Sequence, residues 1–271
     1  MNSVPTKFTR LDMNRLITFT QQAFQKVGTN EKDASLMAKL LVETDLRGVF
    51  SHGTRQLDGY IQMMIDQKVN PRPNIQNEVS SQTTAIFDGD GGMGHLPSYQ
   101  AAQFVVEAAK SFGIAGAVTR NHFHFGAAGK YSRLALEQDC IGFSTSAHRF
   151  RPSKDHSILS ASGASPISFA IPAGKQPPIV IDMGAYLGGS GELSQDQLFK
   201  YIPATFFKFI GLGAAAHMMG GFMAGIWMSD PEVDQNAWEG ANQGAFICAI
   251  DISRFRDLEH FKQEVDRHQK D

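Results

Sequence analysis

Two histidines lie two positions apart in the stretch RNHFHFGAAGKY, which runs from Arg120 to Tyr131. The apolar run IAGAVTR before them predicts a strand, so His122 and His124 follow its C-terminal end, where ligands collect in open α/β sheets. The pair could hold a metal from one face of an extended chain, but no Cys, Asp or Glu follows within a few residues, and we expect no metal site. We interpret His124 as a general acid or base. The alternative is that it packs over GAAG and bonds a carbonyl.

A second polar cluster lies in DLRGVFSHGTRQLDGY, residues 45–60. If a helix starts here, Ser51 can cap it, and His52 and Arg55 become neighbours on its surface. Tyr60 lies about two turns further on, within reach of the same side. A cation, an imidazole and a phenol together could hold a carboxylate and exchange a proton. A capped helix whose arginine only bonds carbonyls is the alternative.

Two other stretches carry acidic residues next to predicted strands. Asp182 ends the strand PPIVIDM, where it could either orient a histidine or cap the following turn. DGDGGMG, residues 88–94, does not have the GxGxxG pattern of a phosphate loop, and its two aspartates would repel a phosphate. We interpret DGDGGMG as a turn.

Apolar periodicity and turn residues predict the elements that must position these side chains. The ordering is mixed α/β, with helices at both ends and a sheet in the middle. We divide the chain into an N-terminal helical region (1–75), an α/β core (76–250) and a C-terminal helix (251–271). Helices are expected within 8–46 (two), then over 54–67, 96–113, 129–139, 204–228 and 256–267, and strands over 83–87, 114–120, 140–146, 165–173, 177–183 and 244–252.

The composition favours a protein of the cytoplasm. Of the 271 residues 42% are hydrophobic and 19% charged, and the net charge of −2 gives no general attraction to nucleic acid or to an anionic membrane. Two cysteines make neither a disulfide framework nor a zinc site, and the N-terminal residues lack the apolar run of a signal peptide. The long apolar segment 204–228 is interrupted by Lys208 and His217, so we expect a buried core helix rather than a membrane span.

Several stretches occur together in an order that resembles one family: RGVFSHGTRQLDGY, DGDGGMGH, HFGAAGKY, ASPISFAIPAG and VIDMG. They are similar to the type 2 malate/L-lactate dehydrogenases, over nearly the whole chain. The resemblance implies that family's α/β fold, with a central mixed sheet and N-terminal helices, in place of a GxGxxG Rossmann fold. It also implies an NAD- or NADP-dependent oxidoreductase that acts on a small 2-hydroxy or 2-keto acid or an imino acid, and a homodimer with its active site near the subunit boundary.

The same resemblance assigns roles to particular residues. His124, His52 and Asp182 would be catalytic, with His124 as the proton donor or acceptor. Substrate would be held by Ser51, Arg55 and Tyr60. The cofactor would lie near His148, Gly184, Ala185, Tyr186 and Lys208, of which Lys208 falls on a lysine in the family's FKGYGL-like stretch.

The chain departs from the family pattern where the dinucleotide should lie. The family's GTNP is replaced by residues 163–166, GASP, and its DMATSxxAxGK by residues 182–192, DMGAYLGGSGE. Ala185 and Tyr186 replace a threonine and a serine, and Glu192 replaces a lysine, which turns attraction for a pyrophosphate into repulsion. The first hypothesis is an oxidoreductase with an altered cofactor pocket. The second is a lyase, isomerase or hydrolase on the same fold, without the cofactor, and the third is a non-catalytic descendant.

Overall fold

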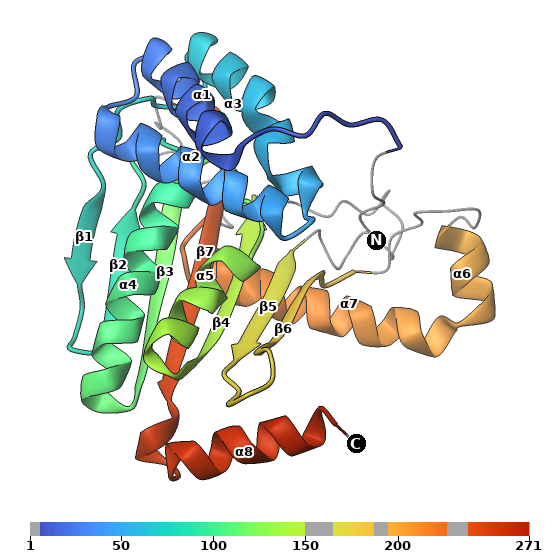
Figure 1. The fold of residues 1–271 in the computed structure, drawn as a ribbon. Coiled ribbons are helices and arrows are strands. Elements are labelled where there is room, and N and C mark those ends of the chain that lie inside the picture. The colour runs from blue at the N-terminus through green and yellow to red at the C-terminus, as the bar shows by residue number, and fades with distance from the viewer. Residues whose placement is uncertain (1–5, 150–164, 187–194, 227–237, 271) are drawn as a thin grey trace.

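A mixed β-sheet of seven strands forms the centre of the molecule (Figure 1). The computed structural model describes residues 6–149, 165–186, 195–226 and 238–270. Within them the strand order is β1-β2-β3-β7-β4-β5-β6, and every pairing except β2–β3 is antiparallel. The strands are β1 (Gln76–Val79), β2 (Thr84–Asp88), β3 (Ile114–His122), β4 (Cys140–His148), β5 (Pro166–Ile171), β6 (Ile179–Gly184) and β7 (Gln243–Asp251). The expected mixed α/β fold is confirmed.

The strand that comes last in the chain lies in the middle of the sheet. β7 is hydrogen-bonded to β3 on one side and to β4 on the other. Its residues Ala245 and Ala249 are fully buried against α4 (His95–Phe112), which contributes Ala102 and Ala109 to the same core. Side chains this small on both surfaces let the helix backbone lie close to the sheet.

Three N-terminal helices cross one end of the sheet, as Figure 1 shows: α1 (Met13–Lys26), α2 (Glu31–Leu46) and α3 (Leu57–Ile65). Asp12 and Asn30 cap the first two by accepting a hydrogen bond from a backbone N–H of the first turn. The helices share a second core that contains Phe24, Leu41 and Tyr60. The C-terminal end of β3 points toward these helices.

The helix expected over 129–139 is shorter and less regular than the sequence indicates. It consists of one α-helical turn, α5 (Gly129–Ser132), followed by a 3₁₀ segment, η3 (Arg133–Gln138). Asp139 ends the segment in the left-handed conformation, with φ of 54°. Close contact with β4 fixes this geometry, because a side chain on Gly142 would overlap the carbonyl of Ser132.

The apolar segment 204–228 is described as far as residue 226, and over that part it is not the buried core helix that its composition indicates. It follows α6 (Gln195–Tyr201) and forms α7 (Pro203–His217), which continues as a π-helical turn, Met218–Phe222. Ala216 packs against the sheet, whereas Phe207 is 56% exposed and Met218 is 51% exposed. Among the described residues, no helix has both the length and the apolar character that a bilayer crossing requires.

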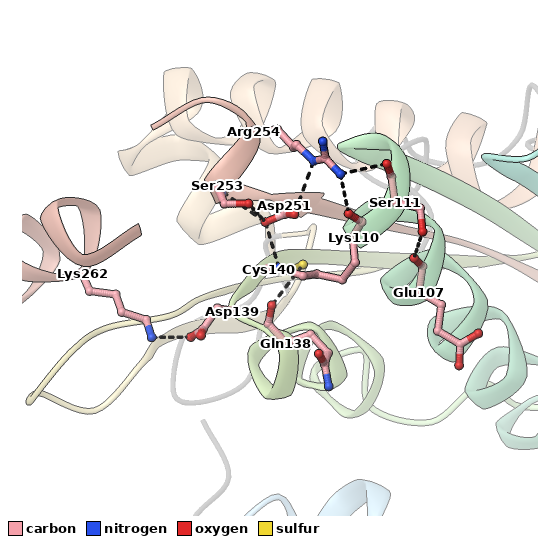
Figure 2. A network of polar contacts seen from close by, with 10 residues as sticks. All are labelled: Glu107, Lys110, Ser111, Gln138, Asp139, Cys140, Asp251, Ser253, Arg254 and Lys262. Atoms are coloured by element: carbon pink, nitrogen blue, oxygen red, sulfur yellow. Dashed lines mark hydrogen bonds and ion pairs between the residues drawn. The ribbon is translucent and has the colours of Figure 1, made fainter. Parts of the chain in front are cut away.

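The C-terminal segment is fastened to the sheet by a polar network at the end opposite the N-terminal helices (Figure 2). The chain leaves β7 through η6 (Ile252–Arg254) and ends in α8 (Leu258–His268). The buried Asp251 carboxylate accepts hydrogen bonds from Lys110 Nζ at 3.1 Å and from the Ser253 backbone N–H at 3.1 Å. Arg254 donates to the carbonyls of Lys110 and Ser111, which ties η6 to the end of α4.

Candidate active site

A cavity of about 780 Å³ opens between the sheet and the end of α2. Its volume lies within the range of small-molecule sites, roughly 300–1,000 Å³. The wall is built from the end of α2, the 3₁₀ turn η1 (Phe50–His52), the segment 124–133, the ends of β4 and β6, and the start of β7. The predicted residues Ser51, His52, His124, His148, Asp182, Gly184 and Tyr186 all line it.

His124 is held in the cavity wall by Tyr60. The hydroxyl of Tyr60 lies 2.5 Å from His124 Nδ1, and the Tyr60 side chain is almost fully buried. Burial raises the pKa of Tyr60, so the phenol stays protonated and can donate to or accept from the ring. Burial is also the main reason that the pKa of His124 falls to about 4, with the positive potential of His52 and Lys130 acting in the same direction. His124 is therefore neutral at physiological pH, with Nε2 left to meet a ligand.

Asp45 holds the turn that carries Ser51 and His52 in place through hydrogen bonds. The Asp45 carboxylate accepts hydrogen bonds from the backbone N–H and the hydroxyl of Thr54, at 3.0 and 2.5 Å. A side chain on Gly53 would overlap this carboxylate, so only glycine lets the chain turn this tightly around Asp45. Ser51 Oγ then lies 2.8 Å from His52 Nδ1, which sets the orientation of that ring.

His52 faces His124 across the cavity, with 5.6 Å between ring centroids. Burial is the main cause that lowers the pKa of His52, and Lys130 adds to it, while Asp182 opposes the shift. Asp182 comes from the end of β6 and accepts a hydrogen bond from the backbone N–H of Gly129. A Cβ atom on Gly129 would come within 2.5 Å of Asp182 Oδ2, so this glycine permits the close contact between α5 and β6.

Three cations that the sequence interpretation did not select also line the cavity. Lys130 is 5% exposed, and its Nζ lies 2.9 Å from His95 Nε2 and 3.2 Å from the carbonyl oxygen of His52. Arg133 lies one turn further along, and the charge of Arg47, at the end of α2, is the second cause after burial that lowers the pKa of Arg133. These cations give the cavity a positive potential that suits an anionic ligand.

The sequence held a usable signal for these cations. Lys130 and Arg133 are three apart directly after GAAG, a spacing that places them on one face of a helical turn. Arg47 precedes the Ser51–His52 pair by four residues in the same motif. His95 carried no such signal, because it starts α4 about 30 residues away in sequence from either motif and meets Lys130 only in the folded chain.

Arg55 and Lys208 lie outside the cavity. The single helix start expected around His52 and Arg55 is instead two 3₁₀ turns, η1 and η2 (Thr54–Gln56), separated by Gly53. Arg55, which follows that break, is exposed. Lys208 is exposed on α7 and does not line the cavity. Tyr60 does not line it either, and contributes through its bond to His124.

The region predicted to hold the cofactor is described in part. His148, Gly184 and Tyr186 line the cavity, with Tyr186 43% exposed. Ala185 is fully buried behind them, and its backbone N–H donates to the carbonyl of Ser165 at 2.8 Å. The departures from the family pattern at 164 and 192 lie outside the described residues.

Comparison with known proteins agrees with this geometry. Residues 11–195 match the family described as malate/L-lactate dehydrogenase. The malate dehydrogenase of Pyrococcus horikoshii is 29% identical over 97% of this chain and 82% of its own length. The solved structure of that enzyme superposes with a TM-score of 0.80, covering 98% of this chain and 82% of the other. The sulfolactate dehydrogenase of Methanocaldococcus jannaschii, 24% identical in the structural comparison, shares the fold with a TM-score of 0.74 over 96% of this chain and 83% of its own.

This chain belongs to the malate/L-lactate dehydrogenase family. It is therefore an oxidoreductase of the class that uses NAD or NADP. The residues of the cavity fit such a cofactor in two respects. The lining segment 126–129 carries no side chain larger than a methyl group, which leaves room for a flat ring against the backbone. Arg47 and Arg133 supply positive charge for phosphate groups.

Proposed function

We propose that this protein catalyses the reversible, NAD- or NADP-dependent interconversion of a small 2-hydroxy acid and its 2-keto acid, or of the corresponding amino and imino acids. The observation that carries the proposal is the Tyr60–His124 pair, since it presents a buried, neutral imidazole to a cavity with positive potential. The bound cofactor would supply or accept the hydride at the substrate carbon. The protein must then bind the acid, exclude water and move one proton.

In this proposal, each part of the cavity wall has one task. His124 Nε2 hydrogen-bonds the reacting oxygen or nitrogen of the substrate and exchanges the proton there. Tyr60 fixes the ring of His124 by its hydrogen bond to Nδ1. Ser51 and His52, held by the Asp45 turn, contact the other polar groups of the substrate, and Asp182 supports the positive charge on that side.

The names of the relatives point to acids with a second anionic group. The relatives from the two archaea are named for malate and for sulfolactate, each a 2-hydroxy acid with a second acidic group. The positive potential from Lys130, Arg47 and Arg133 supports a substrate of this kind here.

The proposal is tested by binding and then by turnover. NADH or NADPH should bind with a dissociation constant of micromolar order, about −8 kcal/mol, measured by the fluorescence of the reduced nicotinamide. A screen of 2-keto and imino acids should then identify turnover that His124→Ala lowers by roughly 10²- to 10⁴-fold without unfolding the protein. His268→Ala, on the exposed side of α8, is the matched control and should keep full activity.

A second candidate function is a non-redox lyase, isomerase or hydrolase reaction on the same small acids. Tyr186 favours it, because a bulky phenol lines the cavity where the family has a small hydroxyl side chain. No saturable binding of either NADH or NADPH up to millimolar concentration, in protein that still binds a 2-keto acid, would select this second function.

We also infer a homodimer in a reducing compartment such as the cytoplasm. Phe19 of α1 and Met218 after α7 expose apolar side chains of the kind that subunit interfaces bury. Cys140 and Cys248 are both free thiols. Sedimentation of a monomer at micromolar concentration would contradict the dimer.

A further inference from the structure

Lys130 occupies an unusual place for a lysine, because its ammonium group lies in the cavity wall rather than in solvent. The side chain is 5% exposed, and Nζ has two acceptors, His95 Nε2 at 2.9 Å and the His52 carbonyl oxygen at 3.2 Å. Burial keeps His95 neutral by lowering its pKa well below the usual range, so its Nε2 can accept. Neither acceptor carries a negative charge. A buried ammonium without an anionic partner is costly, which makes this group a candidate to bind an anion.

The backbone conformation at Gly126 leaves the space that the Lys130 side chain needs in the cavity wall. Gly126 has a φ of 84°, a conformation that a residue with a side chain rarely adopts. A Cβ atom there would come within 2.6 Å of His95 Nε2 and 2.8 Å of Lys130 Nζ. Glycine at 126 therefore allows the lysine and the histidine to meet directly behind the loop that carries His124.

The two hydrogen bonds leave one N–H of the ammonium group unassigned. An ammonium group has three donors in a tetrahedral arrangement, and two of them point to His95 and His52. Lys130 lines the cavity, so the third donor is available to a ligand inside it. Arg55, which helical spacing selected to hold the substrate carboxylate, does not line the cavity. Among the lysine and arginine side chains that do line it, Lys130 is the most deeply buried.

We propose that Lys130 is the residue that anchors the carboxylate of the substrate, through the third N–H of its ammonium group. The proposal rests on the proposed function only in the identity of the ligand, a small 2-keto or 2-hydroxy acid. Bound in this way, the acid lies beside both His52 and His124, which are 5.6 Å apart between ring centroids. Lys130 thus selects substrates with an anionic group next to the reacting carbon.

The anchor makes binding depend on pH. Burial is the largest cause that lowers the pKa of Lys130 to about 7, and Arg47 adds to it, whereas Asp182 and Asp45 oppose it. In the free protein the group is charged below pH 7 and neutral above it. Affinity for a carboxylate should therefore be constant at low pH and fall up to tenfold per unit above about pH 7. The groups that face Lys130 from the packed elements are His52, His95, His124, Asp182, Arg47 and Asp45.

The test measures equilibrium binding of oxamate, a non-reacting analogue of a 2-keto acid, by calorimetry from pH 6 to 9 with saturating NADH. The wild-type protein should show the loss of affinity above pH 7. Lys130→Gln keeps a hydrogen-bond donor but not the charge, so it should bind weakly and without that pH dependence. Arg47→Gln and Arg133→Gln are the matched controls. Each removes a permanent cation of the same wall, so affinity should fall at every pH while its decrease with rising pH remains. In Arg47→Gln that decrease should begin at a higher pH, because the charge of Arg47 lowers the pKa of Lys130.

A second measurement follows the protonation and accessibility of Lys130 directly and does not depend on enzyme activity. Acetylation by acetic anhydride, followed by peptide mass spectrometry, should show Lys130 titrating near neutral pH and protected by oxamate in the presence of NADH. Two results would overturn the proposal that Lys130 anchors the carboxylate. One is failure of oxamate to protect Lys130 from acetylation, and the other is an oxamate affinity that still falls above pH 7 in Lys130→Gln. If the proposed function itself is wrong, the result is different: the wild-type protein does not bind NADH or NADPH.

Discussion

Replacing Tyr60 by phenylalanine removes one oxygen atom and tests whether Tyr60 positions His124. The phenol oxygen is 2.5 Å from His124 Nδ1, and the tyrosine is 2% exposed. The ring of phenylalanine fills the same space, so the packing against Phe123, 6.2 Å away between centroids, is retained. What is lost is the single hydrogen bond that fixes the imidazole.

The size of the effect follows from the burial of both partners. Removing one partner of a buried hydrogen bond leaves the other unsatisfied and costs about 1–3 kcal/mol. The free energy of unfolding of Tyr60→Phe should fall by that amount. If the bond holds His124 in its productive orientation, the transition state loses a similar amount of stabilisation. About 1.4 kcal/mol of lost stabilisation corresponds to a tenfold lower rate. We expect kcat to fall about 10- to 100-fold while KM changes little.

The assay compares urea unfolding with steady-state kinetics on the substrate found in the screen. Tyr131→Phe is the matched control, because Tyr131 is equally buried and its hydroxyl donates to the carbonyl of Phe125 at 2.6 Å rather than to the His124 ring. Both variants should lose stability, but only Tyr60→Phe should lose turnover. Equal losses of kcat in the two variants, or none in Tyr60→Phe, would refute the positioning role.

Three further predictions concern stability and are measured by urea unfolding. Gly142→Ala should destabilise the protein by about 3 kcal/mol or more, since the new methyl group overlaps the backbone of α5, whereas Gly211→Ala, in an open part of α7, should be neutral or stabilising by up to about 1 kcal/mol. Asp251→Asn should cost about 1.5–3 kcal/mol through its charged bond to Lys110; an unchanged midpoint would contradict the network of Figure 2. Burial lowers the pKa of His122 to about 4, below its unfolded value of 6.5, so stability should be complete above pH 6.5 and fall toward pH 4. His122→Asn should show a shallower pH dependence in that window.

Most of the fold could be predicted from local patterns. The strands at 114–120 and 140–146 and the helix at 96–113 were expected close to their observed positions, because apolar alternation and helical periodicity follow directly from which face is buried. β1 (Gln76–Val79) was not predicted, since this polar edge strand shows no alternation and pairs on one side only.

The long apolar segment shows the limit of composition as a guide. Residues 204–228 are apolar enough to indicate a core, yet Phe207 in α7 and Met218 in the turn that follows it are exposed in a single chain. Composition reports that a surface is apolar but not what covers it, and a second subunit can bury such a surface as well as the chain itself can.

The candidate site likewise contains residues that the sequence could select and others that depend on the fold. His124, His52 and Asp182 could be selected because each follows a recognisable local pattern, and the structure brings them to one cavity. Arg55 was selected by helical spacing, but it follows the break at Gly53 and is exposed. A change of one residue in where a helix starts rotates every later side chain by about 100°, so spacing alone cannot decide which residue faces a site.

The sequence by itself determined the family, the α/β class and the small set of polar residues able to do chemistry, because motifs and periodicity are written in neighbouring residues. Only the tertiary structure decided which of those residues meet. It inserted β7 between β3 and β4, brought Tyr60 to His124 across 64 positions of chain, and seated Lys130 against His95. Those contacts depend on how whole helices and strands pack, and packing is settled by the combined burial of many side chains rather than by any local pattern.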